Sequence, residues 1–173
     1  MMTQGLLAGA AGTLALDIYT YADIFATARP PSTLPATTVQ KIAERVGLSG
    51  LARDDGDAPK NRRGGAGALL GYAVGLGAGV GYAVTRPALR RLIPWPVAGA
   101  ILGGTTLVLS EGSATALGAT DWSTWTPQEW LADIVPRTLY GLTVAFVIER
   151  FLEQRARAGD SSVRFDNRER SGE

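Results

Sequence analysis

Two long stretches without charge constrain the fold of this chain more than any other feature. Residues 64–85 and residues 92–110 contain no Asp, Glu, Lys or Arg. Each reaches the length of about 20 apolar residues that an α-helix needs to cross the hydrocarbon core of a bilayer. A chain of 173 residues is too small to enclose several helices that are apolar on nearly every side. The sequence therefore favours a membrane protein, and a soluble helical protein is the alternative.

Two further apolar segments are each interrupted by charge. Residues 1–28 carry only Asp17 and Asp23, and residues 130–148 carry only Asp133 and Arg137. Prolines punctuate the ends of these segments, as expected for helix boundaries. We therefore expect an all-α fold, an integral membrane four-helix bundle that forms one domain over residues 1–151. The predicted spans lie near residues 4–27, 65–85, 96–118 and 130–151.

The polar segments have separate expectations. In the loop 28–64, Val39, Ile42 and Val46 share one helical face, which predicts a short amphipathic helix over residues 36–47 on the membrane surface, followed by a flexible charged linker. The charged tail, residues 152–173, is expected to be disordered or loosely attached because it offers little apolar surface to bury. The basic residues near the span ends, including Arg86, Arg90 and Arg91, favour both termini in the cytoplasm by a small margin.

Composition excludes several classes of chemistry. The chain contains no cysteine and no histidine, so disulfide frameworks, zinc hydrolysis and Ser-His-Asp catalysis lack their usual residues. The net charge of +1 argues against a nucleic-acid partner. No catalytic motif is present, and we expect no enzyme activity, no cofactor and no metal site.

The second predicted span carries glycines at four-residue spacing. Such positions form a ridge without side chains, which allows another helix to approach closely in lipid. The same spacing recurs at Gly5 and Gly9 and at Gly99 and Gly103. The neighbouring helix belongs either to the same chain or to a second copy in a homo-oligomer. The predicted helix-packing residues are Gly67, Gly71, Gly75 and Gly79.

Ionisable residues inside the predicted spans are the feature of the sequence that most directly suggests a functional site. At 1.5 Å per residue, Asp17, Glu111 and Arg137 lie about 10 to 15 Å below the surface that carries the first and third loops. Asp133 and Arg137 are four residues apart and can pair along one helix face. We expect Arg137 to bridge Asp133 and either Asp17 or Glu111. This intramembrane polar cluster is interpreted as a structural ion-pair knot, as a proton or ion relay, or as a polar-ligand site, while snorkelling to the interface is a further alternative.

Three tryptophans precede the fourth predicted span. Trp122, Trp125 and Trp130 stand in or beside a loop without Lys or Arg. That position is typical of an aromatic belt at the headgroup level, so we interpret them as interfacial anchors. An aromatic cage for a ligand is the alternative.

The first and third loops resemble each other in sequence. "STLPATTVQKI", residues 32–42, aligns with "STWTPQEWLADI", residues 123–134, after one insertion. The similarity favours two duplicated helical hairpins, with chance similarity as the rival explanation.

Four segments also point to a family. They are "GAAGTLALDIYTYADI" at 9–24, "RPPSTLP" at 29–35, "NRRGGAGALLGY" at 61–72 and "WLADIVPRTLYG" at 130–141. Over residues 4–150 the chain resembles uncharacterised small, glycine-rich four-span membrane proteins of high-GC bacteria, which are distantly similar in layout to the YagU-like inner-membrane proteins. The resemblance implies a multi-pass protein of the bacterial cytoplasmic membrane and no catalytic residues.

Two functional hypotheses follow from these features. The first is a non-enzymatic membrane protein, a scaffold or an accessory subunit. Its partners would be the lipid bilayer and a homo-oligomer or larger membrane assembly. The alternative is a small oligomeric transporter or channel that uses the intramembrane layer of acids and Arg137.

Overall fold

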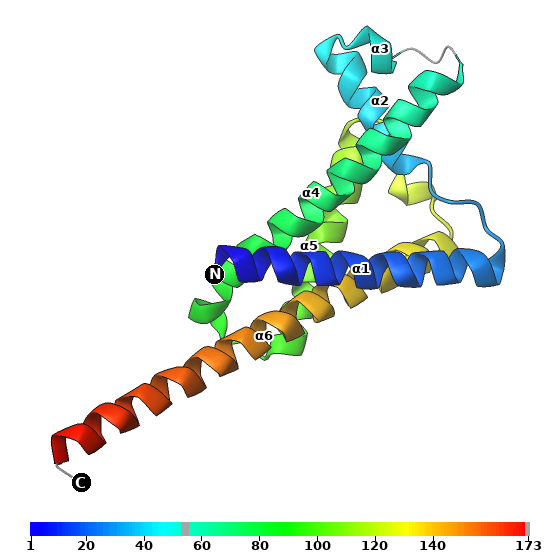
Figure 1. The fold of residues 1–173 in the computed structure, drawn as a ribbon. Helices are drawn as coiled ribbons and strands as arrows, with labels where there is room; N and C mark the ends of the chain where they lie inside the picture. The colour runs from blue at the N-terminus through cyan, green and yellow to red at the C-terminus, as the bar shows by residue number, and fades with distance from the viewer. Residues whose placement is uncertain (53–55, 172–173) are drawn as a thin grey trace.

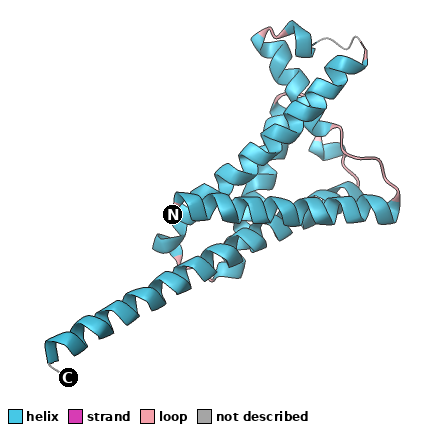
Figure 2. Cartoon of the chain, in the orientation of Figure 1, coloured by secondary structure: helices cyan, strands magenta, loops and turns pink. Residues whose placement is uncertain are grey.

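The computed structural model describes the backbone of residues 1–52 and 56–171 and the side chains of residues 1–52 and 56–157. Within these residues the structure contains helices and no strand (Figure 2), which confirms the all-α fold class. The helices, in chain order, are α1 (Met2–Thr27), α2 (Leu34–Val46), α3 (Ser49–Ala52), α4 (Asp57–Leu89), α5 (Trp95–Ala116), the 3₁₀ turn η1 (Trp122–Thr124) and α6 (Pro127–Ser171).

Three of these helices are long and apolar enough to cross a membrane. They are α4, α5 and the segment Pro127–Arg157 of α6. They correspond to the second, third and fourth predicted spans. The first predicted span forms α1, which has 26 residues but is not one of the three. Asp17 and Asp23, together with threonines, tyrosines and glycines, lower its hydropathy, so its crossing of a membrane stays a prediction.

Two polar segments that were expected to lack regular structure are partly helical. Helix α4 begins at Asp57, within the predicted flexible linker. Asp57 and Pro59 suit a helical first turn, because an acid favours the positive end of the helix and proline is tolerated there. Residues 53–55 of the linker lie outside the described residues.

The tail differs from expectation in the same way. Helix α6 continues through the tail to Ser171, where the sequence predicts disorder. Glutamate, glutamine, arginine and alanine are good helix formers, and extending an existing helix avoids the cost of nucleating a new one. Residues 172–173 and the side chains after Arg157 lie outside the described part, so attachment of the tail stays untested.

The four long helices form a row instead of a closed bundle. Helix α6 packs against α5 and against α1, and α1 packs in turn against α4. Helix α4 has few backbone contacts with α5, and it meets α6 mainly through the side chains of Tyr140 and Glu149. Figure 1 shows α1 and α6 together, with the N-terminal part of α4 and helix α2 projecting away from them. The order in the row is therefore α5, α6, α1, α4. Whether the hairpins α1–α4 and α5–α6 arose by duplication stays a prediction.

Helix α2 lies where a short helix was predicted over residues 36–47, and it contacts both α4 and the end of α5. Its Arg45 donates a hydrogen bond to the carbonyl oxygen of Ala116 in α5 at 3.0 Å. Helix α2 packs along the first part of α4, and an added Cβ on Gly67 would lie 2.8 Å from the carbonyl carbon of Pro35. Ala43 is buried, whereas Ile42 and Val46 of the apolar face are exposed. The predicted position on a membrane surface stays untested.

Glycines allow the closest contacts between the helices of the row. An added Cβ on Gly79 would lie 2.6 Å from the carbonyl oxygen of Gly5 and 2.6 Å from the Cα of Gly9. An added Cβ on Gly103 would lie 2.5 Å from the carbonyl oxygen of Arg137. Real side chains do not approach backbone atoms this closely, so glycine is required at these positions in α4 and α5.

The predicted glycine ridge on α4 is only partly used. Gly75 faces Thr13 of α1, Gly79 faces the backbone of α1, and Gly67 faces α2, but nothing lies within 4 Å of a Cβ added to Gly71. The ridge therefore serves two neighbours, α2 and α1, with a gap between them. Both neighbours belong to the same chain.

The core between the helices is small and contains one long-range polar link. It consists of Ala8, Tyr82, Ala83, Ala98, Tyr140, Val144, Ala145 and Ile148. The hydroxyl of Tyr140 on α6 donates a hydrogen bond to the carbonyl oxygen of Gly75 on α4 at 2.6 Å. An added Cβ on Gly12 of α1 would lie 2.8 Å from the Tyr140 ring. Gly12 thus leaves room for the tyrosine to reach past α1.

Replacing Tyr140 by phenylalanine should lower the free energy of unfolding by about 1 kcal/mol, since it removes one buried hydrogen bond and little apolar area. The measurement is thermal or denaturant unfolding in detergent. Tyr72→Phe is the control, because the Tyr72 hydroxyl donates to Asp17 in an exposed contact at 3.2 Å. Equal unfolding curves for Tyr140→Phe and the unaltered protein would contradict the link.

Candidate functional site

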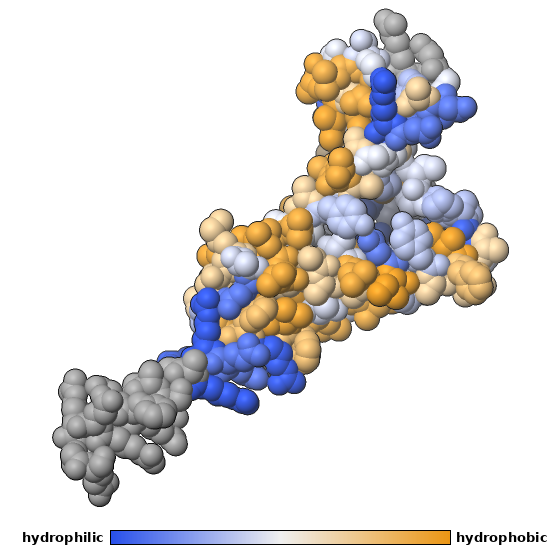
Figure 3. Space-filling model, in the orientation of Figure 1, coloured by the Kyte–Doolittle hydropathy of each residue, from blue (hydrophilic) through white to orange (hydrophobic). Residues whose placement is uncertain are grey.

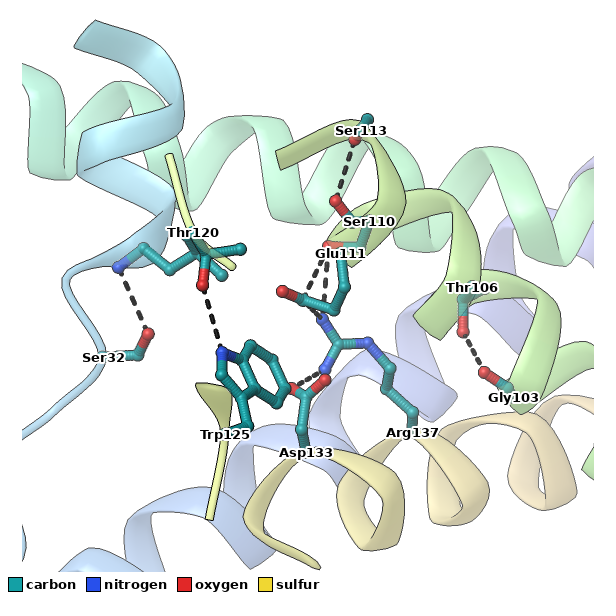
Figure 4. A network of polar contacts seen from close by, with 11 residues as sticks. Ser32, Gly103, Thr106, Ser110, Glu111, Ser113, Thr120, Trp125, Asp133 and Arg137 are labelled. Carbon is teal, nitrogen blue, oxygen red and sulfur yellow. Dashed lines mark hydrogen bonds and ion pairs between the residues drawn. The ribbon is translucent and has the colours of Figure 1, made fainter. Parts of the chain in front are cut away.

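Arg137 on α6 lies between two carboxylates. Its Nη1 donates a hydrogen bond to Asp133 one turn earlier on the same helix. Its Nη2 donates to Glu111 Oε1 of α5 at 2.5 Å and to Ser110 Oγ at 3.2 Å (Figure 4). The predicted bridging position of Arg137 is therefore confirmed, with Glu111 as the partner from another helix. We call Asp133, Arg137 and Glu111 the Arg137 cluster.

The local sequence explains how the cluster forms. Gly103 lets α5 contact the α6 backbone at Arg137, and the two helices run in opposite directions after a short connection. Helical side chains lean toward the N-terminus of their helix. The Arg137 side chain therefore extends toward the start of α6, which is the level at which Glu111 lies near the end of α5.

Glu111 is buried, Arg137 and Asp133 are partly buried, and the cluster contains more acid than base. The side chains of Glu111, Arg137 and Asp133 are 1%, 17% and 22% exposed. Charges taken out of water are costly unless they are paired. Glu111 Oε2 and Asp133 Oδ2 are buried and make no hydrogen bond within the described residues. One cation thus serves two carboxylates and leaves one oxygen of each without a partner.

Asp17 does not join this cluster. It lies on α1 and accepts a hydrogen bond from the Tyr72 hydroxyl of α4. Helix α1 packs on α4 and α6, whereas Glu111 lies on α5. The structure therefore brings Glu111 and not Asp17 to Arg137, and a shared depth of Asp17 with the cluster stays a prediction.

A second buried ion-pair cluster was not expected from the sequence. Arg86 Nε lies 2.5 Å from Glu149 Oε1, and Arg90 Nε lies 3.0 Å from Glu149 Oε2. Arg86 Nη1 also donates to the carbonyl oxygen of Ile93 at 2.7 Å. We call Arg86, Arg90 and Glu149 the Glu149 cluster. The signal was present, because Glu149 lies near the C-terminal end of the fourth predicted span and Arg86 directly follows the second. The second and fourth spans of such a chain run in the same direction, so their C-terminal ends lie at the same level.

The three tryptophans pack on one another. The ring centroids of Trp122 and Trp130 are 6.4 Å apart, and those of Trp125 and Trp130 are 5.3 Å apart. The indole nitrogen of Trp125 donates to Thr120 Oγ1 at 3.1 Å. All three rings are half-buried, so they cover the loop between α5 and α6 as a group. Their role as interfacial anchors stays a prediction.

Asp121 organises the turn that carries Trp122. Its carboxylate accepts hydrogen bonds from the hydroxyl and the backbone N–H of Ser123, at 2.7 Å and 3.0 Å. These bonds favour the ionised form and lower the pKa of Asp121, with the hydroxyl contributing most. The turn is thus held by a local polar contact beside the tryptophans.

The described residues around the Arg137 cluster include no metal centre. In the part of the chain that the structure describes, no three His, Cys, Asp or Glu side chains are grouped so that they could hold a metal ion. A shallow groove of about 420 Å³ lies instead along α5, lined by Ile101, Gly104, Thr105, Val108 and Leu109. Gly103, the contact with α6, is buried, whereas the lining residues are exposed, so the groove is on the outer face of α5.

These features define a class, an all-helical protein with three helices apolar enough to cross a membrane and a buried ion-pair cluster near each end of its α5–α6 hairpin. A comparison of the chain with models of known protein families gives no match, and neither do comparisons with curated proteins and with solved structures. The resemblance to YagU-like proteins accordingly stays a prediction.

Proposed function

We propose that this chain is an integral membrane protein with a structural role, either a scaffold or an accessory subunit of a larger membrane assembly. The three long apolar helices support the membrane location. So do large apolar side chains on outward faces, such as Phe25, Leu69 and Leu92, which are 90%, 71% and 76% exposed. The apolar colouring in Figure 3 covers much of the visible surface between the polar ends. A protein in water rarely leaves so large an apolar surface uncovered.

Helix α1 is proposed as the fourth span of a multi-pass protein of the bacterial cytoplasmic membrane. It lies in the row between α4 and α6, which are both candidate spans. Its outward residues Leu7, Leu14 and Ile18 are exposed. A helix held between two spans is shielded on two sides, so Asp17 and its contact with Tyr72 are less costly there than on an isolated helix.

The main support for the structural role is that Arg137 pairs with two carboxylates of its own chain. Each terminal nitrogen of Arg137 donates to a carboxylate of the same chain. Glu111 is 1% exposed, and the groove on α5 lies on the outer face of that helix. The cluster therefore stabilises the packing of α5 against α6.

A small oligomeric transporter or channel is the second candidate. The observation that favours it is the pair of buried oxygens, Glu111 Oε2 and Asp133 Oδ2, that lack partners in the described structure. A conformation that exposed them to water would offer two acceptors to a proton or a small cation.

One set of experiments separates the two functions. The structural role predicts that the protein stays in the membrane pellet after alkaline carbonate washing and co-purifies in mild detergent with a stoichiometric partner or with further copies of itself. In proteoliposomes with a pH gradient, the unaltered protein and Glu111→Gln should leak protons equally. A Glu111-dependent flux would favour the transporter, and release by carbonate would contradict the membrane location.

A further inference from the structure

The end of the molecule that carries the Glu149 cluster has an excess of arginine. Arg86 and Arg90 share the single carboxylate of Glu149, so this cluster has one uncompensated positive charge. Arg91 follows directly, is exposed and forms no ion pair within the described residues. We call Arg86, Arg90, Arg91 and Glu149 the basic end.

Arg90 is held in place while most of its donors stay free. Its Nε donates to Glu149 Oε2 at 3.0 Å, and its side chain is 40% exposed. Glu149 is fixed in turn by Arg86, whose side chain is only 2% exposed. A guanidinium has five N–H groups, and the terminal nitrogens of Arg90 make no hydrogen bond to the described residues. The ion pair of Arg86 with Glu149 therefore fixes the orientation of the Arg90 guanidinium, whose terminal N–H groups stay available at the surface.

Apolar and aromatic residues surround these arginines. Leu89 and Leu92, on either side of Arg90 and Arg91, are exposed. Trp95 packs edge-on against Phe146 with ring centroids 5.9 Å apart, and the Arg150 guanidinium lies 4.9 Å from the Phe146 centroid. Tryptophan and arginine beside exposed leucine are the combination found at the boundary between headgroups and acyl chains. Figure 3 shows hydrophilic residues directly bordering the apolar surface where the tail begins.

We propose that the basic end binds the phosphate of an anionic phospholipid, with Arg90 and Arg91 as the phosphate ligands and Leu92 against the acyl chains. This inference rests on the proposed membrane location. Guanidinium groups match the geometry of phosphate oxygens. The uncompensated charge favours a lipid with net negative charge over a zwitterionic one, and the exposed leucines favour a lipid over a soluble phosphate compound.

The test compares lipid retention by native mass spectrometry after incubation with equal amounts of phosphatidylglycerol and phosphatidylcholine of the same acyl chains. The unaltered protein should retain phosphatidylglycerol preferentially. The preference should fall about fivefold for each arginine removed, in Arg91→Gln and in Arg90→Gln/Arg91→Gln. The matched control is Lys60→Gln/Arg62→Gln, which removes two exposed charges near the start of α4 and should keep the preference.

Three outcomes would overturn the proposal, and a melting-temperature measurement distinguishes them from a loss of folding. Equal retention of both lipids by the unaltered protein, an unchanged preference in Arg91→Gln, or an equal loss in the control would each contradict it. Arg91→Gln leaves the contact of Arg90 with Glu149 intact, so its melting temperature in phosphatidylcholine should equal that of the unaltered protein. Carbonate washing tests the membrane location independently of lipid charge, so failure of the lipid site leaves that result standing.

Discussion

Replacing Arg137 by alanine should destabilise the protein by about 3 to 5 kcal/mol, because it leaves two buried carboxylates without their cation. Glu111 is the more severely affected, since its side chain is 1% exposed and Arg137 is its ion-pair partner. Unfolding in detergent, followed by circular dichroism at increasing temperature or sodium dodecyl sulfate, measures the loss. The control is Arg91→Ala, an exposed arginine whose replacement should change the free energy of unfolding by less than about 0.5 kcal/mol.

A neutral cluster should recover part of this loss. In the triple variant Arg137→Ala/Asp133→Asn/Glu111→Gln the side chains keep nearly the same volume at the two acid positions but carry no charge. Neutral amides cost less to bury than unpaired carboxylates. If the triple variant were as unstable as Arg137→Ala alone, the loss would come from the missing arginine side chain and its packing, and the ion pairs would not be the cause.

Replacing Gly79 by leucine should destabilise the protein by about 3 kcal/mol, at the upper end of the usual overpacking cost. A Cβ at this position would lie 2.6 Å from two backbone atoms of α1, in Gly5 and Gly9. No rotamer change can relieve a clash between backbone atoms and Cβ, so α1 and α4 must move apart. The same unfolding measurement in detergent tests this expectation.

Gly77→Leu is the matched control for the glycine contact. Gly77 lies in the same helix two residues earlier, and nothing lies within 4 Å of a Cβ added there. Leucine at Gly77 should therefore be tolerated and can increase the helix propensity of α4. Similar losses in Gly77→Leu and Gly79→Leu would show that leucine harms α4 itself, without regard to its contact with α1.

The helices could be predicted from the sequence because their signal is local. The absence of charge over residues 64–85 and 92–110 locates the apolar parts of α4 and α5, although α4 begins earlier, at Asp57, and α5 ends later, at Ala116. Asp133 and Arg137 could be paired because the spacing of four residues is a property of one helix. The extension of α6 to Ser171 was not predicted, because the expectation of disorder used only the small apolar surface of the tail. A helix that is already formed can be extended by residues that bury little surface, since elongation needs only a preceding helical turn.

The order of the helices could not be predicted in the same way. The long helices are apolar on nearly all sides, so periodicity does not indicate which face meets which neighbour. The separation of Asp17 from Arg137 and the pairing of Glu149 with Arg86 and Arg90 both depend on that order. The position of a residue along its helix predicts its depth in a membrane. Which residue it pairs with at that depth depends on how the helices pack.

The position of α6 in the row has a consequence for how the chain is assembled during synthesis. Helix α1 can pair with α4 as soon as residue 89 has left the ribosome, but α5 has only minor contact with α4. Helix α5 therefore gains its main packing partner only when α6 has been synthesised. Helix α6 then packs against both α5 and α1. The α1–α4 and α5–α6 hairpins meet through the packing of α6 on α1 and through the contacts of Tyr140 and Glu149 with α4. Synthesis of α6, the last of the four long helices, is therefore the step that joins the two hairpins.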